Sequence, residues 1–234
     1  MRVRWLGQSA FHLTSGSANV LIDPFEDFSA LISARGLRFG YPVERDLPAD
    51  LLVVTHEHAD HNGVGAVAGE PDLVRSTAGT FTTAVGSVLA IASEHDDAAG
   101  TLRGPNLIVA FELGGLRFCH FGDFGQPALR PEQATLIGRP DLLFLPVGAG
   151  PTIGGAQAAA IARDLRPRWV VPMHYRTEWI DFLEPADAFL AEFGDDERVL
   201  LDGSAFETDD LPSRETPVAV VPRVTPQGPA PPGS

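Results

Sequence analysis

Short apolar runs recur along the chain and predict β-strands. They cover residues 3–6, 10–14, 19–22, 51–54, 88–93, 107–112, 116–121, 142–146 and 169–172. Helical segments are predicted at residues 131–137, 155–164 and 185–193, and a late strand within residues 214–223. Two packed β-sheets with helices outside them would accommodate this mixture of elements.

The length of 234 residues is compatible with one compact domain, which we expect over residues 1–224. Residues 225–234 are rich in Pro and Gly and are expected to form a disordered tail. Apolar stretches stay well short of the roughly 18 residues that span a bilayer, and from the composition of the first residues we expect no secretory leader. A cytoplasmic protein without membrane partners is therefore expected, and the lone Cys119 agrees with a reducing compartment.

The formal net charge is −14, from 31 acidic and 17 basic residues. So acidic a surface repels phosphate backbones, and nucleic acid is not expected as a partner. Every basic residue is Arg, which together with abundant Ala, Gly and Pro is typical of a GC-rich bacterial genome. These features leave a small molecule as the expected partner, with homo-oligomers possible.

Candidate metal ligands are concentrated directly after the apolar run at residues 51–54, in His56-Glu57-His58-Ala59-Asp60-His61. Imidazole nitrogens and carboxylate oxygens suit borderline divalent ions such as zinc. Where a chain leaves a strand, residues two apart project to the same side, so His56 and His58 can converge on one ion while Glu57 points away. Asp60 and His61 would then face a second position.

The remaining histidines support a shared site. His95 follows the run at residues 88–93, His120 and Asp123 follow a predicted hairpin, and His174 follows the run at residues 169–172. Because each lies at the end of an apolar strand, one sheet edge could gather them. His12, within a short strand, is expected to be structural.

Taken in order, these residues resemble the signature of the metallo-β-lactamase superfamily, His-x-His-x-Asp-His, then a separate His, a Gly-Asp pair and a last His. Here they read His56, His58, Asp60 and His61, then His95, then Gly122-Asp123, then His174. The segments at residues 1–25, 103–106, 145–148 and 172–175 are similar to a subgroup that includes ascorbate-6-phosphate lactonase-like proteins and N-acyl phosphatidylethanolamine phospholipases. The resemblance implies an α/β (α+β) fold, a four-layer αββα sandwich.

The resemblance also implies a pair of divalent metal ions. It would place one on His56, His58 and His95, the second on Asp60, His61 and His174, and Asp123 between them. Such a pair would supply an activated water for attack on the substrate, and Asp60 would orient this water or accept a proton as the catalytic carboxylate. Zinc is the first expectation, although manganese or iron also fits mixed nitrogen and oxygen ligands.

The expected activity is metal-dependent hydrolysis of a lactone, amide or phosphoester bond in a small molecule. The family's diiron oxidoreductases carry Glu where this chain has His58, which favours hydrolysis over oxygen reduction. A nucleophilic-serine elbow of the Gly-x-Ser-x-Gly type is missing, and Cys119 alone cannot build a thiolate metal site. A phosphodiesterase or nuclease, and a metal-binding sensor without catalysis, remain open as alternatives.

Other positions could contribute to the site. His120 is expected to orient a ligand by a hydrogen bond rather than to bind metal. Segment 24–47 could form either a lid or part of the core. Substrate contacts are expected from side chains close in sequence to the ligands or in a strand-end loop, where an Arg would favour an anionic group: Arg103, Asn106, Thr152, Tyr175 and Arg176.

Overall fold

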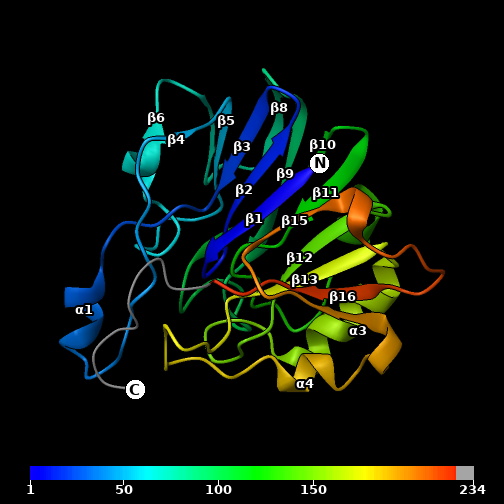
Figure 1. Cartoon of the computed structure of the whole chain (residues 1–234). Coiled ribbons are helices and arrows are strands. Elements are labelled where there is room, and N and C mark those ends of the chain that lie inside the picture. The colour runs from blue at the N-terminus through cyan, green and yellow to red at the C-terminus, as the bar shows by residue number, and fades with distance from the viewer. Residues whose placement is uncertain (225–234) are drawn as a thin grey trace.

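In the computed structural model, which describes residues 1–224, two β-sheets pack against each other around a shared hydrophobic core (Figure 1). The predicted tail at residues 225–234 lies outside the described residues. One sheet has the order β15 (Ala205–Glu207), β1 (Arg2–Gly7), β2 (Ala10–Ser15), β3 (Ala18–Ile22), β5 (Leu51–Val54) and β7 (Asp72–Arg75). The other has the order β14 (Arg198–Leu200), β16 (Val218–Val221), β13 (Trp169–Met173), β12 (Leu142–Pro146), β11 (Leu116–His120), β10 (Pro105–Leu113), β9 (Gly86–Glu94) and β8 (Gly79–Thr83). Short strands β4 (Leu47–Pro48) and β6 (Val67–Ala68) pair separately.

The helices lie outside the sheets. Figure 1 shows α3 (Gly155–Leu165) and α4 (Asp187–Leu190) beyond the sheet that contains β12 and β13, and α1 (Ser29–Ser33) apart from them. The remaining helix, α2 (Pro131–Ile137), precedes β12 in the chain. This arrangement confirms the expected mixed α/β metallo-β-lactamase fold. Within residues 1–224, none of the helices has both the length and the apolar character needed to cross a bilayer.

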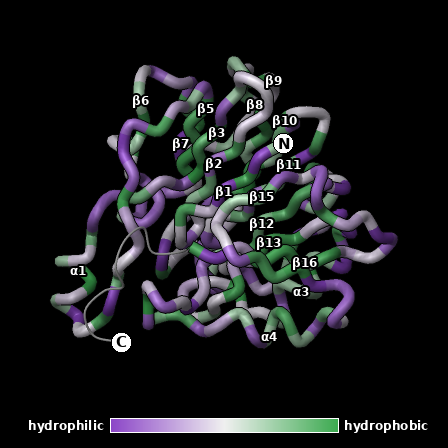
Figure 2. Tube along the Cα trace, viewed as in Figure 1, coloured by the Kyte–Doolittle hydropathy of each residue, from purple (hydrophilic) through white to green (hydrophobic). Residues whose placement is uncertain are grey.

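The central strands of the larger sheet are buried on both faces. Every residue of β12 and β13 is buried, because these parallel strands carry the partner sheet on one side and helices on the other. Figure 2 shows hydrophobic residues along these strands and hydrophilic residues in the outer loops. Full burial explains why both strands are continuous apolar runs rather than alternating ones.

Strand direction brings the predicted ligands to one edge of the sandwich. In the smaller sheet, β1, β3 and β5 run the same way, because β2 is antiparallel to β1 and β3 and β5 is parallel to β3. In the larger sheet, β9, β11 and β13 likewise share a direction. The segments that leave these strand ends carry Gln8, Asp23, His56, His95, Asp123 and His174.

Two kinds of departure from the sequence prediction have simple causes. The unpredicted strands β7 and β8 are edge strands that are largely exposed, so they lack a continuous apolar run. The helix predicted over residues 185–193 is shorter, Asp187–Leu190. Its last residues form tighter turns, in which the Phe193 N–H donates to Leu190 O.

Candidate metal centre

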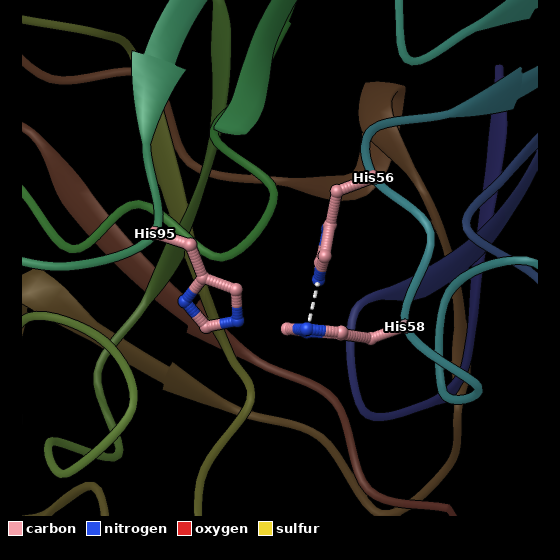
Figure 3. A group of neighbouring side chains, drawn as sticks. All are labelled: His56, His58 and His95. Atoms are coloured by element: carbon pink, nitrogen blue, oxygen red, sulfur yellow. Dashed lines mark hydrogen bonds between the residues drawn. The ribbon is translucent and has the colours of Figure 1, made fainter. Parts of the chain in front are cut away.

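Seven predicted ligands meet in two adjacent groups. Ligand atoms of His56, His58 and His95 lie within 4.8 Å of one another, and the same limit holds for Asp60, His61, Asp123 and His174. Figure 3 shows the first group, with His56 and His58 leaving the loop after β5 and His95 facing them from the end of β9. His56 Nε2 and His58 Nδ1 are 3.1 Å apart.

Asp123 connects the two groups. Its Oδ2 lies 3.1 Å from His95 Nε2 and 3.4 Å from His174 Nε2. Its Oδ1 lies 3.1 Å from His61 Nε2. The carboxylate is 2% exposed, so its oxygens face the imidazoles rather than solvent. A side chain placed in this way could contribute one oxygen to each of two metal positions.

In three of the ligand imidazoles, those of His56, His61 and His95, a hydrogen bond at Nδ1 leaves Nε2 facing the site. His61 Nδ1 lies 2.9 Å from Asp23 Oδ2, and His95 Nδ1 lies 3.0 Å from Pro151 O. These oxygens are acceptors, so each Nδ1 carries a proton, and Nε2 is the nitrogen left to face a metal. Thr55 Oγ1 donates to Asp23 Oδ2 and therefore accepts from His56 Nδ1 at 3.1 Å, which frees His56 Nε2.

Asp23 is a residue of the site to which the sequence analysis gave no role. It is fully buried, and its carboxylate accepts from Thr55 N and Thr55 Oγ1, each at 2.7 Å, and from His61 Nδ1. One carboxylate therefore fixes a tautomer in each ligand group, directly for His61 and through Thr55 for His56. The available signal was an Asp at the end of β3, whose neighbour β5 leads into the ligand loop.

The charges of the site suit metal ions. Burial lowers the pKa of His56 and His58, and the imidazole of His95 lowers both further. Burial alone would raise the pKa of Asp123, but His174 and His61 outweigh it and hold that pKa well below its usual range. His61 differs: although burial lowers its pKa, Asp123, Asp60 and Asp23 hold that pKa well above the usual range, so that a metal cation would take the place of a proton there.

A buried nitrogen without a hydrogen-bond partner tests whether the site fits a metal ion. His61 Nε2 is buried and lies 3.1 Å from Asp123 Oδ1, yet it makes no hydrogen bond with any residue that the structure describes. A buried nitrogen of this kind costs about 1–3 kcal/mol unless a partner satisfies it. Together with the nitrogen and oxygen donors around it, this atom fits a divalent cation.

Glu57 anchors the ligand loop from outside. As predicted, it points away from His56 and His58: its carboxylate accepts from Arg75 Nε at 2.8 Å, from Arg75 Nη2 at 2.6 Å and from Ser76 Oγ at 2.6 Å. These contacts, chiefly the hydrogen bonds from Arg75, lower the pKa of Glu57 to about 2. The loop is thereby tied to the end of the neighbouring strand β7.

The backbone around the site is strained. Gln8, Asp23 and His174 have φ values of 48°, 45° and 50°, in the left-handed region that side chains rarely adopt. Such residues cost about 1–3 kcal/mol each and persist only where the surrounding structure imposes them. At Gly148, an added Cβ would lie 2.2 Å from His174 O, so glycine is needed for this close approach to the ligand backbone.

His120 and Asn106 support the segment that carries Asp123. His120 Nδ1 accepts from Gly122 N at 3.1 Å and its Nε2 donates to Ser9 O at 2.9 Å, so both ring nitrogens are used within the protein. This agrees with an orienting role. Asn106 is 1% exposed, donates to Ser93 Oγ and Phe121 O, and accepts from Asp123 N. We therefore assign it to the support of Asp123 in place of the substrate contact expected from the sequence.

The other candidate substrate contacts lie in varied surroundings. Arg103 is exposed, and Arg176 Nε donates to Leu183 O at 2.6 Å. Tyr175 is buried and stacks on Trp5 at 5.4 Å between ring centroids. Thr152 is 9% exposed and its hydroxyl donates to Ile153 O. None of these hydrogen bonds or stacking contacts is made with a predicted metal ligand. The roles of the four residues in substrate binding therefore remain predictions.

Two further expectations concern residues outside the ligand groups. Phe25, Phe39 and Tyr41 of segment 24–47 are buried in an aromatic cluster, which places this part of the segment in the core. His12 Nε2 lies 2.9 Å from Pro48 O, away from the ligand loop, in agreement with a structural role.

Replacing Asp23 by Asn is expected to weaken metal binding by roughly 10- to 100-fold, the usual cost of losing an orienting partner. Whichever way the amide turns, its NH₂ group faces a donor, either Thr55 N or the pair Thr55 Oγ1 and His61 Nδ1. Competition with a chromophoric chelator measures the change. Asp50→Asn is the matched control. The Asp50 carboxylate accepts a hydrogen bond from Asn19 N just before β5, at the end of that strand away from the ligand loop. Equal affinity of D23N and the unaltered protein would contradict the assigned role.

Comparison with known proteins gives consistent matches. The family model described as the Beta-lactamase superfamily domain matches residues 2–174. A UPF0173 metal-dependent hydrolase from Methylobacterium nodulans is 32% identical, over 94% of this chain and 100% of that protein. Another from Thermococcus onnurineus is 30% identical, over 86% of this chain and 96% of its own length. The crystal structure of a metallo-beta-lactamase superfamily protein from Thermotoga maritima gives a TM-score of 0.74 at 27% identity, covering 95% of this chain and 99% of that one.

Proposed function

The chain belongs to the metallo-β-lactamase superfamily, in its family of UPF0173 metal-dependent hydrolases. From this premise we propose that it cleaves a lactone, amide or phosphoester bond of a small molecule at a two-metal centre. The observation that carries the proposal is the position of Asp123. Its two oxygens lie 3.1 Å from His95 Nε2 and 3.1 Å from His61 Nε2, which belong to different ligand groups.

In this proposal the first metal position is formed by His56, His58 and His95, and the second by Asp60, His61 and His174, with Asp123 shared. A pair of divalent ions supplies, when bound, a water that ionises near neutral pH and polarisation of the scissile oxygen. The nitrogen-rich set favours zinc, while the carboxylates also admit manganese or iron.

The side chains contribute positioning, exclusion of water and a proton acceptor. His56, His61 and His95 are at most 3% exposed, so they hold their positions in a largely dry environment. Asp60 has a side-chain exposure of 20% and lies 3.5 Å from His174 Nε2, which leaves part of its carboxylate accessible from solvent. We therefore assign Asp60 a double role, as a ligand and as the group that orients the attacking water or briefly takes its proton.

The substrate class within the superfamily is part of the proposal. The similarity of several segments to ascorbate-6-phosphate lactonase-like proteins favours a lactone substrate. The net charge of −14 disfavours nucleic acids, and hence a nuclease.

Metal analysis combined with a substrate panel tests the proposed function. Freshly purified protein is expected to contain close to two metal ions per chain. It is expected to turn over at least one lactone, amide or phosphomonoester faster than bis-p-nitrophenyl phosphate. Preference for the diester would favour the phosphodiesterase alternative, and a fully loaded protein without turnover of any substrate would favour a metal-binding sensor. Either result would overturn the proposal.

A further inference from the structure

Gln8 lies beside the second ligand group, although neither the signature nor the proposed function assigns it a role. It sits in the turn between β1 and β2, is fully buried and has a φ of 48°. Its carbonyl oxygen accepts from Trp5 Nε1 at 2.9 Å and from the backbone N of His174 at 3.1 Å. The backbone of Gln8 is thus fixed to that of a predicted metal ligand.

The side-chain amide of Gln8 reaches a second predicted ligand. Its Nε2 donates to Asp60 Oδ2 at 3.1 Å. An ionised carboxylate can only accept, so the NH₂ group of the amide must face Asp60 and its orientation is unambiguous. The same Oδ2 lies 3.5 Å from His174 Nε2 and 3.7 Å from His61 Nε2, which makes it the oxygen directed at the second metal position.

The side-chain amide of Gln8 destabilises the folded protein at this position. Gln8 Oε1 is buried and makes no hydrogen bond with any of residues 1–224. An unsatisfied buried carbonyl costs about 1–3 kcal/mol, and a left-handed backbone adds a comparable amount. An apolar side chain of similar volume, such as Met, would fill the same space without the first cost. Packing alone therefore does not explain a glutamine here, whereas donation to Asp60 does.

We infer that Gln8 is a positioning residue for the second metal position, whose amide N–H holds Asp60 Oδ2 in the direction of His61 and His174. The inference rests on the proposed two-metal function. Without this hydrogen bond, Asp60 can rotate toward solvent, since its side chain is 20% exposed. The first metal position, formed by three imidazoles and the shared Asp123, does not involve Asp60 and therefore does not depend on Gln8.

Titration of the metal-free protein with Zn²⁺ against a chromophoric chelator tests this role. In Gln8→Met the first equivalent is expected to bind as in the unaltered protein, and the second about 10- to 100-fold more weakly. Gln133→Met is the matched control. Gln133 lies on α2 and is buried like Gln8, at 2% exposed, but its amide contacts Ala92 O and Gln126 rather than Asp60. It is expected to lower the unfolding temperature while both Zn²⁺ affinities stay unchanged.

The outcomes separate the inference from the proposed function. If the unaltered protein binds fewer than two equivalents, the proposed function fails. If it binds two and Gln8→Met binds both with the same affinity, the inference alone is wrong. If Gln8→Met does not fold, Gln8→Asn replaces it: this variant keeps an amide but is one methylene too short to reach Asp60. It must then show the same selective loss of the second equivalent, and equal affinities would overturn the inference.

Discussion

Replacing Asp123 by Ala is expected to reduce turnover at least about a thousandfold while the protein stays folded. Asp123 contacts imidazoles of both ligand groups, so its loss removes an oxygen from each metal position at once. The backbone around it is retained, because Asp123 N still donates to Asn106 Oδ1. Steady-state kinetics with the preferred substrate, metal content and circular dichroism would be measured on the same preparation.

Two comparison variants define this effect. His58→Ala is also expected to abolish turnover, but by weakening only the first metal position, since His58 belongs to that group alone. Asp141→Ala is the control. The Asp141 carboxylate, just before β12, accepts a hydrogen bond from Arg117 N, and its Oδ1 lies 3.6 Å from Arg168 Nη1. It is expected to keep its turnover despite some loss of stability. Turnover by D123A within tenfold of the unaltered protein would exclude a bridging role for Asp123.

Exhaustive chelation is expected to abolish turnover and to lower the midpoint of thermal unfolding by roughly 10 °C. A ligand at about 1,000 times its Kd stabilises the folded state by about 4 kcal/mol. For a chain of 150–250 residues each kcal/mol corresponds to about 2–4 °C. The physical cause is that the folded chain holds the carboxylates and imidazoles of both ligand groups close together, and a bound cation would neutralise the buried negative charge of the carboxylates.

Re-addition of metal provides the control for this experiment. Two equivalents of Zn²⁺ are expected to restore both the turnover and the unfolding temperature, whereas one equivalent restores neither fully. Parallel additions of Mn²⁺ and Fe²⁺ rank the three metals by recovered turnover. Full activity in a sample that has been stripped of metal would refute metal-dependent hydrolysis at this site.

Much of the fold could be predicted because buried strands leave a local pattern. Continuous apolar runs identified β5, β12 and β13, whose residues are all buried. The edge strands β7 and β8 escaped prediction because their stability comes from pairing with a neighbour rather than from burial of their own residues. Helix α3 was found nearly complete, since its apolar positions recur with a helical period.

The candidate ligands could also be identified, because their chemistry is local. His56, His58, Asp60 and His61 lie within six consecutive positions, and such a concentration of nitrogen and oxygen donors is typical of a metal site. His95, Asp123 and His174 were recognisable because each follows a strand. Parallel strand ends meet at one edge, which turns an order along the chain into proximity in space.

The support of these ligands was decided only by the tertiary structure. Asp23 contacts His61 across 38 positions, Gln8 contacts Asp60 across 52, and Ser9 approaches Asp123 across 114. Asp and Gln are common residues, so nothing local distinguishes these two from surface or packing residues. For Asn106, proximity to His95 in the sequence suggested a substrate contact. In the structure its side chain is buried and accepts a hydrogen bond from Asp123 N.

The sequence by itself determined which side chains could bind metal and that they would lie at strand ends, because donor type and apolar patterning are properties of short segments. The tertiary structure decided which nitrogen of His56, His61 and His95 faces the site and which side chains hold these ligands in place. Those features depend on hydrogen bonds between segments far apart in the chain, whose geometry exists only once both sheets have packed.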